Sequence, residues 1–329
     1  MPQASLNRSA LKLVKKMCDE AEKYNVVVEK AESGATLVDA GIDAQGGFFV
    51  GEMITDICLG GFGKANVTLI QYGEDVLPSV FVITDHPALA TLASQFAGWQ
   101  IKGEGFSAIA SGPARALARK PKHLYEKLNY REDAEVAVLV LETEERPPET
   151  VIREIAEKCK VAPENLFLIM FSTTSLAGAT QVSGRIVETG LHKLERLGLD
   201  PLIVKNAWGY APIVPIHPSS GEAMGRTNDA ILYGGVTNYT LNYEDDHELE
   251  NIVKQAPSSA SRMLQEAKKL ADKNPRFLDI FKEAEFDFYK IDPNIFAPAV
   301  VSINNMKTGK TFSAGNLDIE VMKSSLGIT

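Results

Sequence analysis

The chain has 329 residues, more than one hydrophobic core usually serves, so its length predicts two lobes. Hydrophobic residues make up 45% and charged residues 23%, as in ordinary globular proteins. The net charge is −9 and the basic residues form no stripe, which argues against a nucleic-acid partner and favours a small-molecule ligand.

The three cysteines, Cys18, Cys58 and Cys159, are odd in number and far apart, which indicates a reducing compartment rather than a disulfide framework. The five histidines are equally scattered, and because no metal-ligand spacing occurs, we expect no metal. No apolar run approaches the roughly 20 residues that a membrane helix needs. By elimination, we expect a cytoplasmic protein that does not enter a membrane.

In chain order, residues 1–24 mix Lys and Glu with spaced apolar residues, which predicts an amphipathic helix rather than a signal peptide. Two strands, 26–28 and 35–39, follow with a turn between them. A short helix, 50–59, then ends at Gly60-Gly61.

The glycine cluster at residues 60–64 fits neither phosphate-binding pattern. The Walker spacing needs Gly at position 58 and Ser or Thr at position 65, where Cys58 and Ala65 stand. Asn66 occupies the last glycine position of the dinucleotide pattern. We therefore expect neither a P-loop nor a Rossmann fold, and a helix cap accounts for the glycines.

Two predicted strands lead directly into helices. The first, 80–84, continues through Asp85-His86-Pro87 into an alanine-rich helix, so Asp85 and His86 are either helix caps or ligand contacts. The second, 106–110, leads into Ser111-Gly-Pro-Ala-Arg115. There free backbone N–H groups, a hydroxyl and a guanidinium would converge, which suits an anion such as phosphate; the alternative is a simple cap.

Residues 119–135 are charged and carry no long apolar run, so we place the lobe boundary there, with lobes at 1–130 and 131–329. The second lobe would open with a strand, 136–141, and a helix, 147–160.

The stretch 173–192 follows a solidly apolar run, 166–171, that predicts a buried strand. Apolar residues then recur at helical spacing, and Arg185 and Glu188, three apart, would share one helix face. A cation and a carboxylate at the mouth of a strand-loop-helix unit suit chemistry, and the hydroxyls and Gln181 before them favour it. The alternative is a solvated surface pair contributing a few tenths of a kcal/mol.

The remaining chain predicts an irregular, proline-punctuated connector at 201–218 and a strand at 231–241. Arg226, Thr227 and Asn228 precede that strand, in either a solvated turn or a polar binding loop. A charged helical region, 245–272, is interrupted near Pro257. A C-terminal hairpin, 299–306 with 310–314, turns at Thr308-Gly309, and whether it returns to the first lobe stays open.

Several motifs together resemble one family, the methenyltetrahydromethanopterin cyclohydrolases, over nearly the whole chain. The matching segments are Asp39-Ala-Gly41, Cys58-Leu-Gly-Gly61, Asp85-His-Pro-Ala88, Ala97-Gly-Trp99, Ser111-Gly-Pro-Ala-Arg-Ala116, Ser183-Gly-Arg-Ile-Val-Glu188, Ala223-Met-Gly-Arg-Thr-Asn-Asp229, Phe288-Tyr-Lys-Ile-Asp-Pro293 and Thr308-Gly-Lys310.

The resemblance implies an α/β (α+β) fold of two mixed lobes with a large pocket between them, assembled as a cytoplasmic homotrimer without metal or organic cofactor. It implies interconversion of a 5,10-methenyl pterin cation and water with the 5-formyl pterin in one-carbon metabolism. The family's catalytic Arg and Glu fall on Arg185 and Glu188, inside an intact motif.

The candidate pterin contacts come from the junctions and matching motifs above. They are Asp85, His86, Trp99, Ser111, Arg115, Gln181, Arg226, Thr227 and Asn228. The competing interpretation is a non-catalytic protein that binds a pterin or channels it to a partner.

Overall fold

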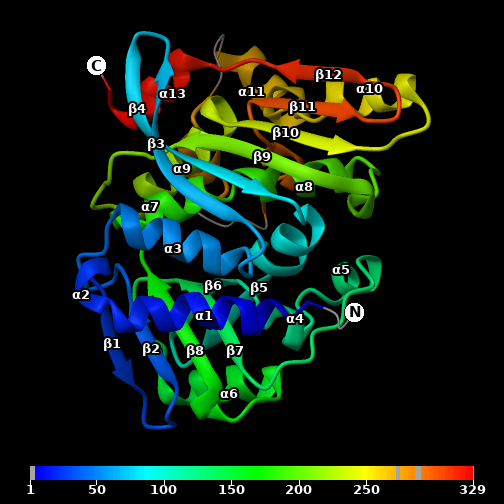
Figure 1. Cartoon of the computed structure of the whole chain (residues 1–329). Helices are drawn as coiled ribbons and strands as arrows, with labels where there is room; N and C mark the ends of the chain where they lie inside the picture. The colour runs from blue at the N-terminus through cyan, green and yellow to red at the C-terminus, as the bar shows by residue number, and fades with distance from the viewer. Residues whose placement is uncertain (1–3, 272–274, 286–289, 329) are drawn as a thin grey trace. The chain divides into compact units, whose positions relative to one another are not determined.

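The computed structural model describes residues 4–271, 275–285 and 290–328. The chain divides into two compact units: unit 1 comprises Met1–Ala65 and Ala88–Gln181, and unit 2 comprises Asn66–Pro87 and Val182–Thr329. Each unit contains one six-stranded sheet with both parallel and antiparallel neighbours, which confirms the predicted α/β class (Figure 1).

The sheet of unit 1 is built around three parallel central strands, because β2 and β7 both pair parallel with β8. The pairs β1–β2, β6–β7 and β5–β6 are antiparallel. In spatial order the strands are β1 (Val27–Lys30), β2 (Thr36–Asp39), β8 (Leu166–Phe171), β7 (Ala137–Glu142), β6 (Phe106–Ser111) and β5 (Trp99–Gly103).

Helices cover both faces of this sheet, which is why its central strands are continuous apolar runs. On one face, α1 (Leu6–Asp19) and α3 (Phe48–Cys58) contribute to the core around Val138 and Ile169. On the other face, α6 (Glu149–Cys159) packs around Leu139. The smaller helical elements of unit 1 are α2 (Ala21–Tyr24), η1 (Ala88–Gln95, a π-helix), α4 (Ala114–Ala118), α5 (Lys122–Lys127) and η2 (Pro163–Asn165).

The lobe boundary expected near residue 130 does not coincide with this division. Strand β6 lies before that boundary and β7 after it, yet they pair as neighbours in one sheet, and β7 continues the sheet to β8 (Figure 1). The charged segment 119–135 contains α5 and connects two strands of unit 1. Its low apolar content therefore reflects a connection within one sheet.

The sheet of unit 2 combines strands from three separate parts of the chain. In spatial order they are β12 (Lys310–Gly315), β11 (Val300–Asn305), β10 (Val236–Leu241), β9 (Val204–Pro212), β4 (Asp75–Thr84) and β3 (Lys64–Tyr72). The predicted C-terminal hairpin is confirmed as β11–β12, and it extends this sheet through parallel pairing of β11 with β10. It therefore lies in unit 2.

The prediction of an irregular connector at 201–218 is wrong for its first half, because β9 is a nine-residue strand paired on both sides, with β10 and β4. Pro212 stands at the last position of that strand, where proline is tolerated. Strand β9 therefore joins β10, β11 and β12 on one side of the sheet to β4 and β3 on the other.

The prediction of a turn or loop at residues 226–229 is also wrong. These residues lie inside α9 (Ser220–Gly234), a helix whose Thr227 and Asp229 side chains have no exposed surface. Contacts with α12 (Phe277–Glu283) and α13 (Ile319–Leu326) stabilise this glycine-containing helix. A Cβ on Gly225 would lie 2.6 Å from the side chain of Leu278, so the small residue allows close packing there.

The remaining helical elements of unit 2 include the charged region near the C-terminal hairpin, which the sequence correctly predicts as helical with a break at Pro257. They are α8 (Ile186–Arg196), η3 (Pro201–Ile203), α10 (Asp246–Gln255), η4 (Ser258–Ala260), α11 (Arg262–Ala271) and η6 (Pro293–Ile295). Helix α7 (Leu176–Ser183) runs across the division between the units. None of the helices in the described ranges is both long and apolar enough to span a bilayer.

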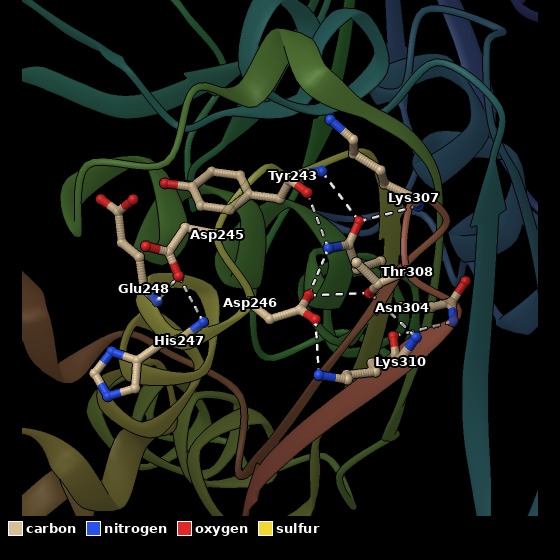
Figure 2. Close-up of polar contacts among 10 residues, drawn as sticks. Tyr243, Asp245, Asp246, His247, Glu248, Asn304, Lys307, Thr308 and Lys310 are labelled. Atoms are coloured by element: carbon tan, nitrogen blue, oxygen red, sulfur yellow. Dashed lines mark hydrogen bonds and ion pairs between the residues drawn. The ribbon is translucent and has the colours of Figure 1, made fainter.

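A polar network fixes the C-terminal hairpin to the start of α10 (Figure 2). The Asn305 side chain accepts hydrogen bonds from the backbone N–H groups of Tyr243 and Lys307, and donates to the Tyr243 carbonyl and the Asp246 carboxylate. The Asp246 carboxylate also contacts Thr308 and Lys310. The matching motif Thr308-Gly-Lys310 is thus part of a structural clamp. Positions 288 and 289 of another matching segment lie outside the described residues.

Candidate active site

Arg185 and Glu188 form a buried ion pair at the start of α8. Helix α7 ends at Ser183, Arg185 occupies the N-cap of α8, and Glu188 lies in its first turn. The Arg185 Nη2 to Glu188 Oε2 distance is 2.5 Å, and their side chains are only 12% and 5% exposed. The predicted shared face is confirmed, and the burial excludes the alternative of a solvated surface pair.

Burial raises the free-energy cost of removing either partner of this ion pair. An exposed ion pair contributes roughly 0–1 kcal/mol, whereas removing one partner of a buried pair typically costs about 3–5 kcal/mol because the other charge is left unpaired. The N-terminal end of a helix also favours negative charge, and Glu188 lies in the first turn of α8. The site therefore holds a carboxylate out of bulk water and beside a guanidinium.

The junction between α7 and α8 is fixed by side-chain hydrogen bonds to the backbone. The Ser183 hydroxyl donates to the Pro212 carbonyl at the end of β9, at 2.8 Å. The Thr189 hydroxyl donates to the Arg185 carbonyl at 3.1 Å. These contacts hold the first turn of α8 in one geometry, which a pre-organised acid–base group needs.

His192 lies one helical turn beyond Glu188, a neighbour that the sequence analysis did not single out. Burial lowers its pKa from the usual 6.5, although the Glu188 charge acts in the opposite direction. Its imidazole is therefore neutral at pH 7. The signal available in the sequence was the spacing of four from Glu188, which brings two helical side chains together.

Three of the candidate pterin contacts in unit 1 are interior residues. Trp99 is 4% exposed within the core, and Ser111, at the end of β6, is 5% exposed. Arg115 has no exposed surface; its Nη1 donates to the Ser94 carbonyl at 2.9 Å, and its guanidinium lies 5.3 Å from the centre of the Phe96 ring. Arg115 thus holds the end of η1, and its predicted role as an anion anchor stays a prediction.

Gln181, the fourth candidate in unit 1, combines burial with an unused acceptor. Its side chain is 1% exposed, and its Nε2 contacts the Cys58 Sγ at 3.5 Å. Within the part of the chain that the structure describes, its Oε1 has no hydrogen-bond partner. Because a buried polar atom without a partner costs about 1–3 kcal/mol, this oxygen is suited to receive an N–H group.

The candidates in unit 2 make local contacts. The Asp85 carboxylate accepts from the exposed Asn206 amide at 2.6 Å, and the His86 backbone N–H donates to the Thr84 hydroxyl. In α9, the Arg226 guanidinium donates to the Leu326 carbonyl at 3.2 Å. The Thr227 hydroxyl and the Asn228 amide both donate to the Met224 carbonyl. The binding roles of these five residues stay predictions.

Among the residues that the structure describes, no group of three or more His, Cys, Asp or Glu side chains is arranged to hold a metal ion.

Two mixed sheets and a buried carboxylate–guanidinium pair at a helix start define an α/β protein with a site suited to proton transfer. A family model described as Cyclohydrolase (MCH) matches residues 5–326, and the chain belongs to that family. It is therefore an enzyme of the hydrolase class.

Curated relatives match along the whole chain. The methenyltetrahydromethanopterin cyclohydrolase of Methanocaldococcus jannaschii is 45% identical over 328 residues, which cover 99% of both chains. The enzymes of that name from Methanothermobacter marburgensis and Methanococcoides burtonii are 42% and 40% identical, over 98% of this chain and 99% and 98% of theirs.

Proposed function

We propose that the enzyme interconverts 5,10-methenyltetrahydromethanopterin and water with 5-formyltetrahydromethanopterin in one-carbon metabolism. The names of relatives that match over essentially the whole chain support the substrate. The observation that carries the chemistry is the buried ion pair of Arg185 and Glu188 at the start of α8.

The group that the enzyme must supply for this reaction is a base, because the substrate carbon is already an electrophile. The methenyl carbon lies between two nitrogens that share its positive charge, so it is already electron-poor, and we propose that no metal or organic cofactor is required. Glu188 accepts a proton from the attacking water as the new C–O bond forms. The bond from this carbon to one nitrogen then breaks, Glu188 returns the proton to that nitrogen, and the hydroxyl proton leaves as the formyl carbonyl forms.

Arg185 is the electrostatic partner of the Glu188 carboxylate and orients it. A pair of opposite charges about 4 Å apart gains about 4 kcal/mol at an effective dielectric near 20, and the same attraction acts between Glu188 and the pterin cation. The guanidinium, which is planar and rich in donors, also suits an oxygen that gains negative charge during the attack. Arg185 therefore acts on both the base and the developing product.

The remaining candidate residues are proposed as pterin contacts, and Gln181 is the best supported of them. Its buried Oε1 accepts an N–H group, which the amide-like edge of a pterin ring provides. If the pterin side chain carries a phosphate, the guanidinium of Arg115 or Arg226 is the chemical complement.

The experiment follows the absorbance of the methenyl group with and without enzyme, for methanopterin and folate substrates in parallel. Wild-type enzyme is expected to accelerate its decay with the methanopterin substrate. Glu188→Gln should keep the fold and pterin binding while losing about 10²- to 10⁴-fold in turnover, the usual contribution of a general base. Near-normal turnover would remove Glu188 from this role. A non-catalytic carrier would bind the pterin and leave its absorbance unchanged.

We also propose a homotrimer that works in the cytoplasm. Cys18, Cys58 and Cys159 are free thiols, which supports a reducing compartment. For the trimer, the support is one face of the unit 2 sheet, which we call the open face. Along β10 and β11 its positions alternate with the buried ones, and on every strand they are half-buried or exposed. They are Phe81, Ile83, Asn206, Trp208, Tyr210, Val236, Asn238, Thr240, Val300, Ser302, Asn304, Thr311, Ser313 and Gly315.

The open face carries no charged residue at any of these positions, and Phe81 and Trp208 stack on it with ring centres 6.2 Å apart. Depletion of charge with enrichment of aromatic residues is typical of the central part of a subunit interface. A second copy of the chain is the partner that a homotrimer would place there.

A further inference from the structure

Tyr239 contacts the backbone of the helix that carries Glu188. It lies on the buried face of β10 with no exposed surface, and its hydroxyl donates to the Val187 carbonyl at 2.8 Å. That carbonyl and the backbone nitrogen of Glu188 belong to one planar peptide group. A hydrogen bond to the Val187 oxygen therefore fixes the orientation of the peptide plane from which the Glu188 side chain extends.

The contact depends on the absence of a side chain at Gly190. A Cβ placed there would lie 2.2 Å from the Tyr239 hydroxyl, 3.1 Å from the Thr237 hydroxyl and 3.2 Å from the Pro298 ring. Glycine in a helix interior costs about 1 kcal/mol relative to alanine. The gain at this position is the close approach of α8 to β10, which brings the phenol within hydrogen-bonding distance of the helix backbone.

The phenol is a permanent donor in this position. Burial raises its pKa far above the usual 10, and the nearby Glu188 carboxylate acts in the same direction. The hydroxyl therefore keeps its proton throughout the working range of an enzyme. A carbonyl oxygen has two lone pairs, so Val187 accepts this bond without giving up its place in the helix.

We propose that Tyr239, with Gly190, is a positioning residue that sets the orientation of the Glu188 carboxylate for proton transfer. The inference rests on the proposed function, because it assigns to Tyr239 an effect on the turnover that Glu188 supports. Tyr239 acts through the Val187–Glu188 peptide group. It thus belongs to the site without being a catalytic residue.

The first test is Tyr239→Phe, which removes one oxygen and keeps the ring. Turnover should fall about 10- to 100-fold, the range expected when a reacting group is misplaced by up to 1 Å. KM should stay within about twofold of the wild-type value, because loss of an interaction that matters in the transition state lowers kcat and kcat/KM together.

The matched control is Tyr233→Phe. The Tyr233 hydroxyl also donates to a backbone carbonyl, that of Pro275, and its side chain is also buried, but it extends from α9. This variant should lose thermal stability as Tyr239→Phe does and keep its turnover. If the two variants lose stability equally and both keep wild-type turnover, Tyr239 is only a structural residue and the proposal is overturned.

The second test adds a methyl group and then makes room for it. Gly190→Ala improves helix propensity but creates the 2.2 Å contact, so it should lose at least as much turnover as Tyr239→Phe. The double variant combines Gly190→Ala with Tyr239→Phe. Because it lacks the hydroxyl that the new methyl group would contact, its turnover should rise above that of Gly190→Ala alone. Equal turnover in the single Ala variant and the double variant would contradict coupling through the hydroxyl.

These outcomes are separable from failure of the proposed function. If wild-type enzyme does not hydrolyse the methenyl pterin, the proposed function fails. If the wild-type enzyme is active, Glu188→Gln is inactive, and Tyr239→Phe retains wild-type kcat, only the positioning inference fails.

Discussion

Asp229 is a carboxyl group with no exposed surface, on a helix that the sequence presents as a polar loop. It accepts hydrogen bonds from the Phe277 backbone N–H at 2.6 Å and from the Ser325 hydroxyl at 2.5 Å, and so joins α12 and α13 to α9. Burial raises its pKa to about 7 from the usual 3.8, against these two hydrogen bonds and the charge of Arg276, which lower it.

This shift predicts how Asp229 couples stability to pH. Because the folded-state pKa is raised, its contribution is fully present below pH 3.8 and is lost as pH rises through about 7. A shift of about three pKa units corresponds to about 4 kcal/mol at most. Asp229→Asn keeps an acceptor for Phe277 and can donate to Ser325, so it should be more stable than wild type at pH 8 and lose this pH dependence.

Urea unfolding of both proteins at pH 5.5 and pH 8 checks this prediction. The difference in unfolding free energy between the two pH values should be smaller in the variant. If wild type and Asp229→Asn respond identically to pH, Asp229 is ionised in the folded protein.

At the residue scale the sequence shows which side chains share a helix face but not which are buried. The spacing of Arg185 and Glu188 places them together, and the structure confirms this. Their burial could not be predicted, because it depends on how α8 packs against the sheet strands β9 and β10, and helix spacing does not show that packing. Arg115 illustrates the same limit: its position after a strand does not show that its guanidinium is fully buried and donates to the Ser94 carbonyl.

At the scale of elements, a single side chain holds the C-terminal hairpin. Asn305 has no exposed surface and fills its hydrogen-bonding capacity with Tyr243, Lys307 and Asp246. Asn305→Ala would remove four hydrogen bonds, three of them to partly buried backbone groups of Tyr243 and Lys307. Each such bond contributes about 0.5–1.5 kcal/mol, so the variant should lose about 2–4 kcal/mol of unfolding free energy.

Denaturant unfolding of Asn305→Ala measures this loss, and Asn251→Ala is the control. Asn251 is an exposed asparagine on α10 whose amide contacts His247, so its replacement should change stability by less than about 0.5 kcal/mol. Equal stability of the two variants would show that the clamp contributes nothing to the fold.

Elements with local signals were predictable. The apolar runs of β7 and β8, the hairpin β11–β12 and the amphipathic α1 all follow from periodicity and turn residues. Strand β9 was missed because its tryptophan, glycine and proline give no clear alternation, and pairing with β10 and β4 defines it instead. Helix α9 was missed because glycine and hydroxyl residues favour turns, and tertiary contacts with α12 and α13 override that preference.

At the scale of the whole chain, the division into units is not continuous in sequence. Residues 66–87 leave unit 1 and join the sheet of unit 2, where β4 pairs with β9 from more than a hundred residues later. Composition along the chain carries no trace of such non-local pairing. The sequence therefore predicted two α/β lobes and misplaced their boundary.

The proposed trimer interface, the open face of the unit 2 sheet, can be tested directly. If the open face is the subunit interface, light scattering should give a particle of three 35.8 kDa chains. Ser302 lies on β11, next to the edge strand β12, and is half-buried in the single chain, with its hydroxyl 2.8 Å from that of Ser313. Ser302→Glu should be tolerated by the folded monomer but place an unpaired charge in the interface, at a cost of several kcal/mol. The trimer should therefore dissociate while the circular dichroism spectrum is retained.

The control is Lys268→Glu, on the exposed surface of α11, which should leave the trimer intact. A trimer that survives Ser302→Glu would place the subunit contact elsewhere on the molecule.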